Sequence, residues 1–171
     1  FEDMYIPKEN VLGNPSKGFK QFLRTLTGGR ITIGALALGT AQGAYERALK
    51  YSCEREAFGK QINKFQAISF KLADMATSIE ASKHLVYNAA YLKDKGEDII
   101  KEAAMAKLFS SEMCMRVTTE AIQVLGGYGY IKEYDVERFF RDSKILEIGE
   151  GTSEVQRIII SREILKNISS V

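Results

Sequence analysis

Apolar residues recur at spacings of three and four along most of this chain, as in helices that bury one face. The segment 64–94 shows this most clearly, through Phe65, Ile68, Leu72, Met75, Ile79, Val86 and Ala89. The segment 98–125 repeats it, through Ile100, Ala103, Ala104, Leu108, Val117, Ala121 and Leu125. A polar stretch, KDKGED (93–98), separates the two runs. The pattern predicts two long antiparallel helices joined by a short turn.

Further helices are predicted on both sides of this pair. The segment 29–55 is rich in Ile, Leu, Ala and Gly, and its small residues would permit close helix contact: Gly34, Gly39, Ala41, Gly43 and Ala44. The stretch GGYGY (126–130) breaks the helical pattern. A short helix is expected over 132–142, and a last one from about Ser153 to Asn167. Long helices with short connections predict an all-α fold, an up-down-up-down four-helix bundle.

The first residues differ from the rest of the chain. FEDMYIPKENVLG alternates weakly between apolar and polar positions and contains a proline, which indicates the end of a strand and a linker. Nothing from Pro15 onward resembles a strand. We therefore expect a short strand remnant and linker over 1–14 and a helical bundle domain over 15–171. Because the chain does not begin with Met, we expect it to be a piece of a longer protein.

Composition narrows the classes of function. No apolar run approaches the roughly 20 residues that cross a bilayer, and the formal net charge of +2 is too small to indicate nucleic acid binding. The N-terminus lacks the pattern of a signal peptide. Cys53 and Cys114 lack metal-binding spacing, and are expected to be buried free thiols in a reducing compartment. With His84 as the one histidine, multi-histidine metal sites and serine–histidine catalysis are excluded.

Two polar islands interrupt the helical pattern at helix junctions. In EREAFGKQINKFQ (54–66), Arg55, Phe58 and Gln66 could clamp a phosphate and cover a ring, or form a solvated basic loop. In QVLGGYGY (123–130), Gly126 and Gly127 could expose backbone N–H groups to a ligand, or simply end a helix. The latter stretch is not the G-x-G-x-x-G fingerprint after a strand, so a Rossmann fold is excluded.

A third island is LEIGEGTSEVQR (146–157), where the carboxylate of Glu150 stands between two glycines just before a helix. The flanking glycines allow unusual backbone dihedrals and close approach, and Ser153 with Gln156 fits a capping box. The alternative is a surface loop with a solvated Glu. Arg30, the one basic residue entering an apolar, glycine-rich helix, is a further candidate, with a surface Arg at a helix end as its alternative.

Taken together, these islands resemble the C-terminal helical domain of the acyl-CoA dehydrogenase family. The resemblance covers nearly the whole chain, through the helix that contains GGRITIGALALG, then QVLGGYGY, RFFRDSKI and EGTSEVQR in the family's order and spacing. The opening FEDMYIPKENVLG is similar to the last strand of the family's middle β-domain.

The resemblance implies that Glu150 is the base that removes the α-proton of an acyl-CoA thioester. The β-hydrogen would leave as hydride to FAD, giving the trans-2-enoyl-CoA. Arg30 would bind substrate beside it, and so would Gly149 and Gly151, which flank the base in the same turn. A minority of the family carries the base at the position of Gly29, where glycine cannot act. At Thr27 the family's Asp, a CoA contact, is missing.

The resemblance also implies two sets of FAD contacts. Arg55, Phe58 and Gln66 would hold the FAD of a neighbouring subunit, and its adenosine-diphosphate part would contact Gln123, Val124, Leu125, Gly126 and Gly127. Thr152 and Glu154 would contact FAD in the same subunit. The resemblance further implies that the protein is a homo-oligomer, arranged as a dimer of dimers. It also implies an electron-transferring flavoprotein as partner. The expected location is the cytoplasm, or the mitochondrial matrix in a eukaryote.

One departure bears on specificity. Many family members have Tyr before the base, and this chain has Gly149, which should open room near the reacting carbons. The family's N-terminal helical domain and most of its β-domain are missing, so we expect this piece to be inactive alone. The alternatives are an acyl-CoA oxidase and a helical oligomerisation module without catalysis.

Overall fold

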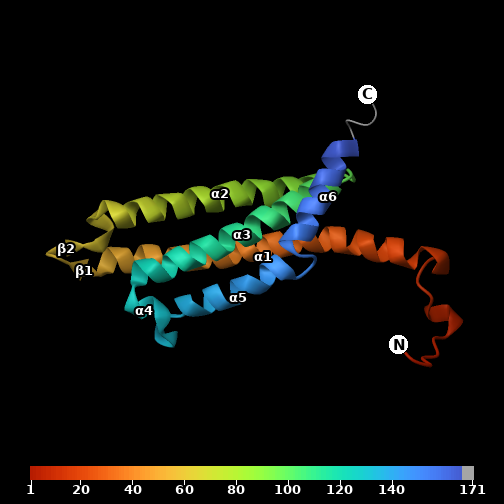
Figure 1. Ribbon diagram of the computed structural model, residues 1–171, viewed down its shortest axis with the longest axis horizontal. Coiled ribbons are helices and arrows are strands. Elements are labelled where there is room, and N and C mark those ends of the chain that lie inside the picture. Colours follow the sequence, from red (N-terminus) through yellow and green to blue (C-terminus); the bar gives the residue numbers. More distant parts are fainter. Residues whose placement is uncertain (167–171) are drawn as a thin grey trace.

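A computed structural model describes residues 1–166 and confirms the all-α fold (Figure 1). Four successive antiparallel helices form the bundle: α1 (Gly18–Glu54), α2 (Gln66–Asp94), α3 (Ile100–Leu125) and α5 (Val136–Ile148). A further helix, α6 (Ser153–Lys166), leaves the end of the bundle where α5 ends. The short elements are η1 (Lys8–Asn10), η2 (Pro15–Lys17), β1 (Glu56–Ala57), β2 (Lys60–Gln61), η3 (Ile62–Lys64), α4 (Gly127–Tyr130) and η4 (Lys132–Tyr134).

Small residues on α1 bring it close to the other helices. Ala37, Ala41, Ala44 and Ala48 are fully buried at spacings of three and four, and form a narrow stripe against α3. A Cβ added at Gly34 would lie 3.5 Å from the Ala106 main chain. The predicted close contact is confirmed for this stripe, but Gly39 is exposed and lies off it.

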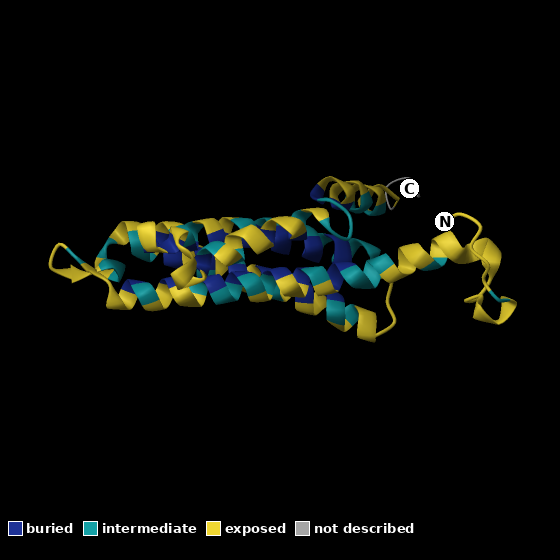
Figure 2. Ribbon diagram, turned by 90° about the horizontal axis from the view of Figure 1, so that it is seen from below, coloured by how far each residue is buried: buried dark blue, intermediate teal, exposed yellow. Residues whose placement is uncertain are grey.

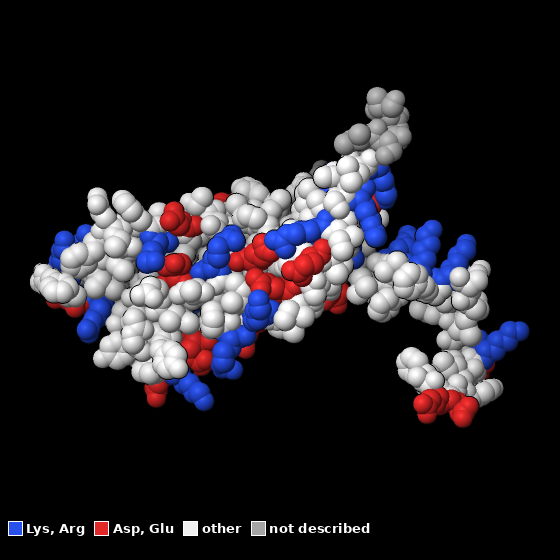
Figure 3. Space-filling view, in the orientation of Figure 1, with Lys and Arg blue, Asp and Glu red and all other residues white. Residues whose placement is uncertain are grey.

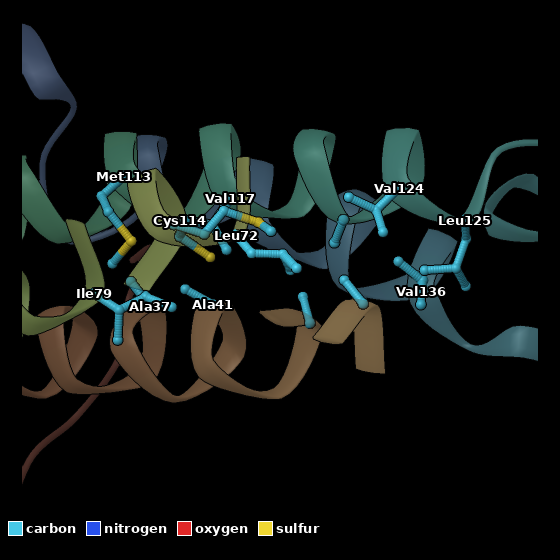
Figure 4. Packing of buried hydrophobic residues seen from close by; sticks show 14 of the residues in the cluster. Ala37, Ala41, Leu72, Ile79, Met113, Cys114, Val117, Val124, Leu125 and Val136 are labelled. Atoms are coloured by element: carbon cyan, nitrogen blue, oxygen red, sulfur yellow. The ribbon is translucent and has the colours of Figure 1, made fainter. Parts of the chain in front are cut away.

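Larger side chains fill the space between α2, α3 and α5 (Figure 4). Leu72 and Ile79 of α2 lie with Met113 and Val117 of α3, and Val136 closes the cluster from α5. Burying each of these aliphatic side chains contributes about 1.5–3 kcal/mol, so the predicted helix faces are what hold the bundle together. Figure 2 shows most of the buried residues inside the bundle, a few at the start of α6, and the N-terminal part of α1 exposed.

The sequence-based expectations for the first half of the chain need three corrections. The helix expected from 29 begins at Gly18, because no residue between 18 and 29 stops a helix. The expected strand over 1–14 does not form; this segment contains only the turn η1, and an extended segment needs a partner strand. The hairpin β1–β2, whose strands have two residues each, was not expected from the sequence. Phe58 and Gly59 form its turn, and both have positive φ.

The helix expected over 132–142 instead spans Val136–Ile148. Asp135 just before it has φ 60°, a left-handed conformation that Asp tolerates better than most residues. This residue separates the 3-10 turn η4 from α5 and sets the start of the helix. The extension to Ile148 carries the chain directly to Glu150.

The two cysteines differ from one another. Cys114 is fully buried, and burial raises the pKa of its thiol to about 12, so it is inert at neutral pH. Cys53, expected to be buried, is exposed, and its Sγ accepts a hydrogen bond from Asn63 Nδ2 at 3.2 Å. Within residues 1–166 there is no cluster of His, Cys, Asp and Glu suited to a metal ion, and no helix long and apolar enough to span a membrane.

Candidate active site

The turn between α5 and α6 has an unusual backbone. Glu150 has φ 57° and Gly151 has φ 94°, so two successive residues lie in the left-handed region. For a non-glycine residue this conformation costs on the order of 1–3 kcal/mol and persists where the surroundings impose it. Gly149, by contrast, is extended at φ −63° and ψ 153°. Of the two flanking glycines, only Gly151 is therefore required by the backbone.

Gly29 leaves room for the carboxylate of Glu150. A Cβ added at Gly29 would lie 2.5 Å from Glu150 Oε2 and 3.0 Å from Cδ, so the carboxylate rests directly against the α1 backbone. Glu150 Oε2 is buried and has no hydrogen-bond partner within residues 1–166. Glu150 is thus half-buried rather than fully solvated, and one of its carboxylate oxygens has no hydrogen-bond partner among the described residues.

Arg30 lies beside this carboxylate, and it is not a surface residue. It is 7% exposed, and its Nη1 donates to Thr27 Oγ1 at 3.4 Å, while its Nε has no partner among the described residues. Burial lowers the pKa of the guanidinium, and Coulomb attraction to Glu150 acts in the opposite direction. The site therefore combines a buried cation and a carboxylate, each with a free hydrogen-bonding atom.

Two side chains hold the turn: Lys107, which the sequence did not single out, and Gln156, which it placed only in a capping box. Lys107 Nζ donates to the Gly151 carbonyl at 2.8 Å, and Gln156 Nε2 donates to the same carbonyl at 2.9 Å and to that of Glu150 at 3.3 Å. The predicted capping box at Ser153 and Gln156 is wrong by one residue. Thr152 is the cap instead, since its Oγ1 accepts from Val155 N–H at 3.4 Å.

The two FAD contacts expected in the same subunit lie next to this turn. Thr152 precedes α6 and Glu154 is in its first turn. A hydrogen bond from Thr152 lowers the pKa of the Glu154 carboxyl, together with its own backbone N–H. Ser153 Oγ is buried there without a partner among the described residues.

The other predicted FAD contacts gather at the opposite end of the bundle, beside the hairpin. A cavity of about 710 Å³ is lined there by seven of them: Arg55, Phe58, Gln123, Val124, Leu125, Gly126 and Gly127. Gln66, exposed at the start of α2, does not line it. Cavities of a few hundred Å³ with apolar walls and few charges are typical ligand sites.

Aromatic rings that were not expected to contact a ligand complete this cavity. Tyr51, Phe65 and Tyr128 line its wall, and the Arg55 guanidinium lies 5.8 Å from the centre of the Tyr128 ring. Phe58 at the hairpin tip is 96% exposed. The Gly126 N–H donates to the carbonyls of Ile122 and Gln123. This glycine therefore ends α3, which was one of the two roles that the sequence allowed for it.

The two sites are far apart within one chain. Arg30 lies on α1 and Arg55 is the residue directly after that helix, so at 1.5 Å per residue their separation along its axis is about 37 Å. Figure 1 shows the hairpin at one end of the bundle and the α5–α6 turn toward the other. The two sets of expected FAD contacts therefore lie toward different ends of the bundle.

Comparison with known proteins assigns this arrangement to a family. The family model described as "Acyl-CoA dehydrogenase, C-terminal domain" matches residues 16–165. The chain therefore belongs to the acyl-CoA dehydrogenase family and corresponds to its C-terminal domain, as the sequence motifs indicated.

Individual relatives support this assignment. The chain is 58% identical over 96% of its length to the "Probable acyl-CoA dehydrogenase YngJ" of Bacillus subtilis. It is 52% identical, also over 96%, to "Caffeyl-CoA reductase-Etf complex subunit CarC" of Acetobacterium woodii. The butyryl-CoA dehydrogenase structure from Megasphaera elsdenii superposes with a TM-score of 0.93 at 52% identity, over 94% of this chain and 42% of that one. The chain spans 43% of YngJ and 44% of CarC.

Proposed function

We propose that this chain is the catalytic C-terminal part of an FAD-dependent acyl-CoA dehydrogenase. The reaction is the α,β-dehydrogenation of an acyl-CoA thioester to the trans-2-enoyl-CoA. Glu150 takes the α-proton onto its carboxylate, and bound FAD accepts the β-hydrogen as hydride. By microscopic reversibility, the same residues serve an enzyme that runs as a reductase, as CarC is named.

The observation that carries this proposal is the placement of Glu150. Its carboxylate lies against Gly29 with a buried, unpartnered oxygen, on a left-handed backbone. A general base needs an acceptor atom that is free in the protein and within reach of the substrate. The neighbouring Arg30, with its own free Nε, supplies a cation for the anionic or carbonyl part of a substrate.

FAD fits the residues present. The cavity beside the hairpin combines the Arg55 cation with aromatic rings, which suits the charged and planar adenosine-diphosphate part. Thr152, Glu154 and the unpartnered Ser153 hydroxyl offer polar groups next to Glu150. Because Arg30, beside these groups, lies about 37 Å along α1 from Arg55 in the cavity, we propose that each FAD contacts two subunits and that the protein is a homo-oligomer, a dimer of dimers.

The electron acceptor and the location are further parts of the proposal. CarC is named as a subunit of a complex with an Etf, which supports an electron-transferring flavoprotein as the partner of this protein. We place the protein in the cytoplasm.

A substrate screen with the full-length protein tests the function. We expect acyl-CoA thioesters to reduce an artificial electron acceptor in its presence, with little oxygen consumed. Rapid oxygen consumption would instead favour the oxidase alternative. A full-length protein without bound flavin and without turnover would favour an oligomerisation module and overturn the proposal.

The acyl group is predicted to extend beyond straight short chains because of Gly149. A Cβ added there has a single neighbour, the Ile145 carbonyl oxygen at 3.4 Å, and the backbone is extended, so a side chain fits without strain. We therefore expect Gly149→Tyr in the full-length protein to lower kcat/KM selectively for branched or β-aryl thioesters. Reshaping an apolar pocket in this way has effects of roughly 10–200-fold.

Comparing the two substrate classes within this one variant supplies the control. An equal loss on straight and substituted thioesters would mean that the ring disturbs the catalytic turn, and the specificity prediction would fail. Both substrate classes occur in the names of the relatives: butyryl-CoA is a straight-chain thioester and caffeyl-CoA is a β-aryl thioester.

The isolated chain is predicted to be helical and to self-associate, yet to bind FAD weakly. Its expected FAD contacts come from two distant sites, and the chain spans only 43% of the length of YngJ. Sedimentation and flavin absorbance of the purified piece check this. A monomer at micromolar concentration would contradict the oligomeric part, and tightly bound flavin would contradict the rest.

A further inference from the structure

A buried lysine, Lys107, contacts the turn that carries Glu150. It lies on α3 and is fully buried, among alanines at 103, 104 and 106. Taking an ammonium group out of water is costly, by several kcal/mol even after the protein relaxes, so such a residue persists only where it has a partner. Its partner here is the Gly151 carbonyl, at 2.8 Å from Nζ.

The Gly151 carbonyl belongs to no helix. The first helical bond of α6 is accepted by Thr152, whose carbonyl takes the Gln156 N–H at 3.0 Å. Gly151 instead receives two side-chain donors, Lys107 and Gln156, which fill both lone pairs of its oxygen. Gln156 is fully buried as well. Two buried side chains from different helices thus converge on one backbone atom, next to the residue that carries the carboxylate.

The charges around Lys107 come from every helix that meets at this junction. Burial lowers the pKa of the ammonium, and the carboxylates of Glu147 on α5, Glu112 on α3 and Glu154 on α6 act in the opposite direction. Arg30 on α1 lowers it further. Figure 3 shows acidic and basic side chains intermixed on the surface where α3, α5 and α6 meet. Burial is the largest of these effects, so the pKa of Lys107 is lowered overall, and the three carboxylates offset only part of that shift.

We propose that Lys107 is a positioning residue for Glu150, acting with Gln156 through the Gly151 carbonyl. This inference rests on the function proposed above. The left-handed pair Glu150–Gly151 is costly in backbone energy, and a fixed Gly151 carbonyl prevents the turn from relaxing. A relaxed turn would carry the carboxylate away from Gly29. Misplacement by about 1 Å is enough to lower a rate by roughly 100-fold.

The test is Lys107→Met in the full-length, flavin-loaded protein. Methionine retains the approximate length and removes the donor, while Gln156 still donates to the Gly151 carbonyl, so no buried acceptor is left without a partner. We expect kcat per bound flavin to fall about 10- to 100-fold, with substrate Kd and thermal stability little changed. Lys101→Met is the matched control: Lys101 lies on the same helix, pairs with Glu102 and does not touch the turn, so full kcat is expected.

Full kcat in Lys107→Met would overturn the inference, and so would a loss explained entirely by lost flavin or unfolding. If Lys107→Met does not accumulate, Gln156→Met is the second variant, because Gln156 donates to the same carbonyl. A fall in kcat per bound flavin there supports the inference, and full activity overturns it. If the wild-type protein oxidises no thioester, both the proposed function and this inference are contradicted. If the wild type and both variants are equally active, only the inference is contradicted.

Discussion

Replacing Glu150 by Gln in the full-length protein is expected to abolish nearly all turnover while FAD and acyl-CoA remain bound. The amide has the shape of the carboxylate but cannot take up the α-proton, and loss of a general base lowers rates by about 10²–10⁴-fold. Steady-state kinetics with a short acyl-CoA, together with substrate Kd and flavin content, provide the measurement.

A second carboxylate supplies the control. Glu137, in the first turn of α5, pairs with Arg141 at 2.7 Å on the surface. Glu137→Gln removes one negative charge at the other end of α5, away from the catalytic turn, and should leave turnover unchanged. Near-normal rates in Glu150→Gln would contradict its assignment as the base.

Gly29→Ala is expected to have the next largest effect. The added Cβ would lie 2.5 Å from Glu150 Oε2, so the carboxylate must move, which is easy for the end of a flexible side chain. Folding should therefore survive, and alanine within a helix is favoured over glycine by about 0.5–1 kcal/mol. We expect an unchanged or higher Tm, and kcat lower by roughly 100-fold because the base is misplaced.

Gly39→Ala separates the two effects on α1. Nothing lies within 4 Å of a Cβ added at Gly39, so this variant gains the same helix propensity without a clash. It should raise Tm and leave kcat unchanged. If Gly29→Ala and Gly39→Ala behave alike, the carboxylate does not depend on the space above Gly29, and the close contact between Gly29 and Glu150 has no role in placing the base.

Much of the fold could be predicted from the sequence, because the helices are amphipathic and their connections are short. The faces of α2 and α3 follow from the three- and four-residue spacing of Leu72, Met75 and Ile79 and of Ala103, Val117 and Ala121. The start of α1 was misplaced, since exposed residues between 18 and 29 bury no face and so leave no pattern. The hairpin was missed because two-residue strands carry no alternation.

The site was predictable only in part. Motifs pointed to Glu150 and Arg30, but the pattern alone did not reveal which glycine the turn needs or that Gly29 lies beneath the carboxylate. Lys107 did leave a signal: it falls on the buried stripe of α3, four residues after Ala103 and three before Ser110. A charged residue on such a stripe requires a buried partner, and the partner, a backbone carbonyl 44 residues later, has no sequence signature.

Anaerobic mixing of the full-length flavoprotein with butyryl-CoA tests the central claim most directly, because a single turnover needs no electron acceptor. We predict that the visible absorbance of the oxidised flavin bleaches in the wild-type protein, as the α-proton moves to Glu150 and the hydride to FAD, and that Glu150→Gln keeps its absorbance. Persistent absorbance in the wild type with butyryl-CoA and with a β-aryl thioester, or equally fast bleaching in Glu150→Gln, would contradict the role of Glu150 as the base.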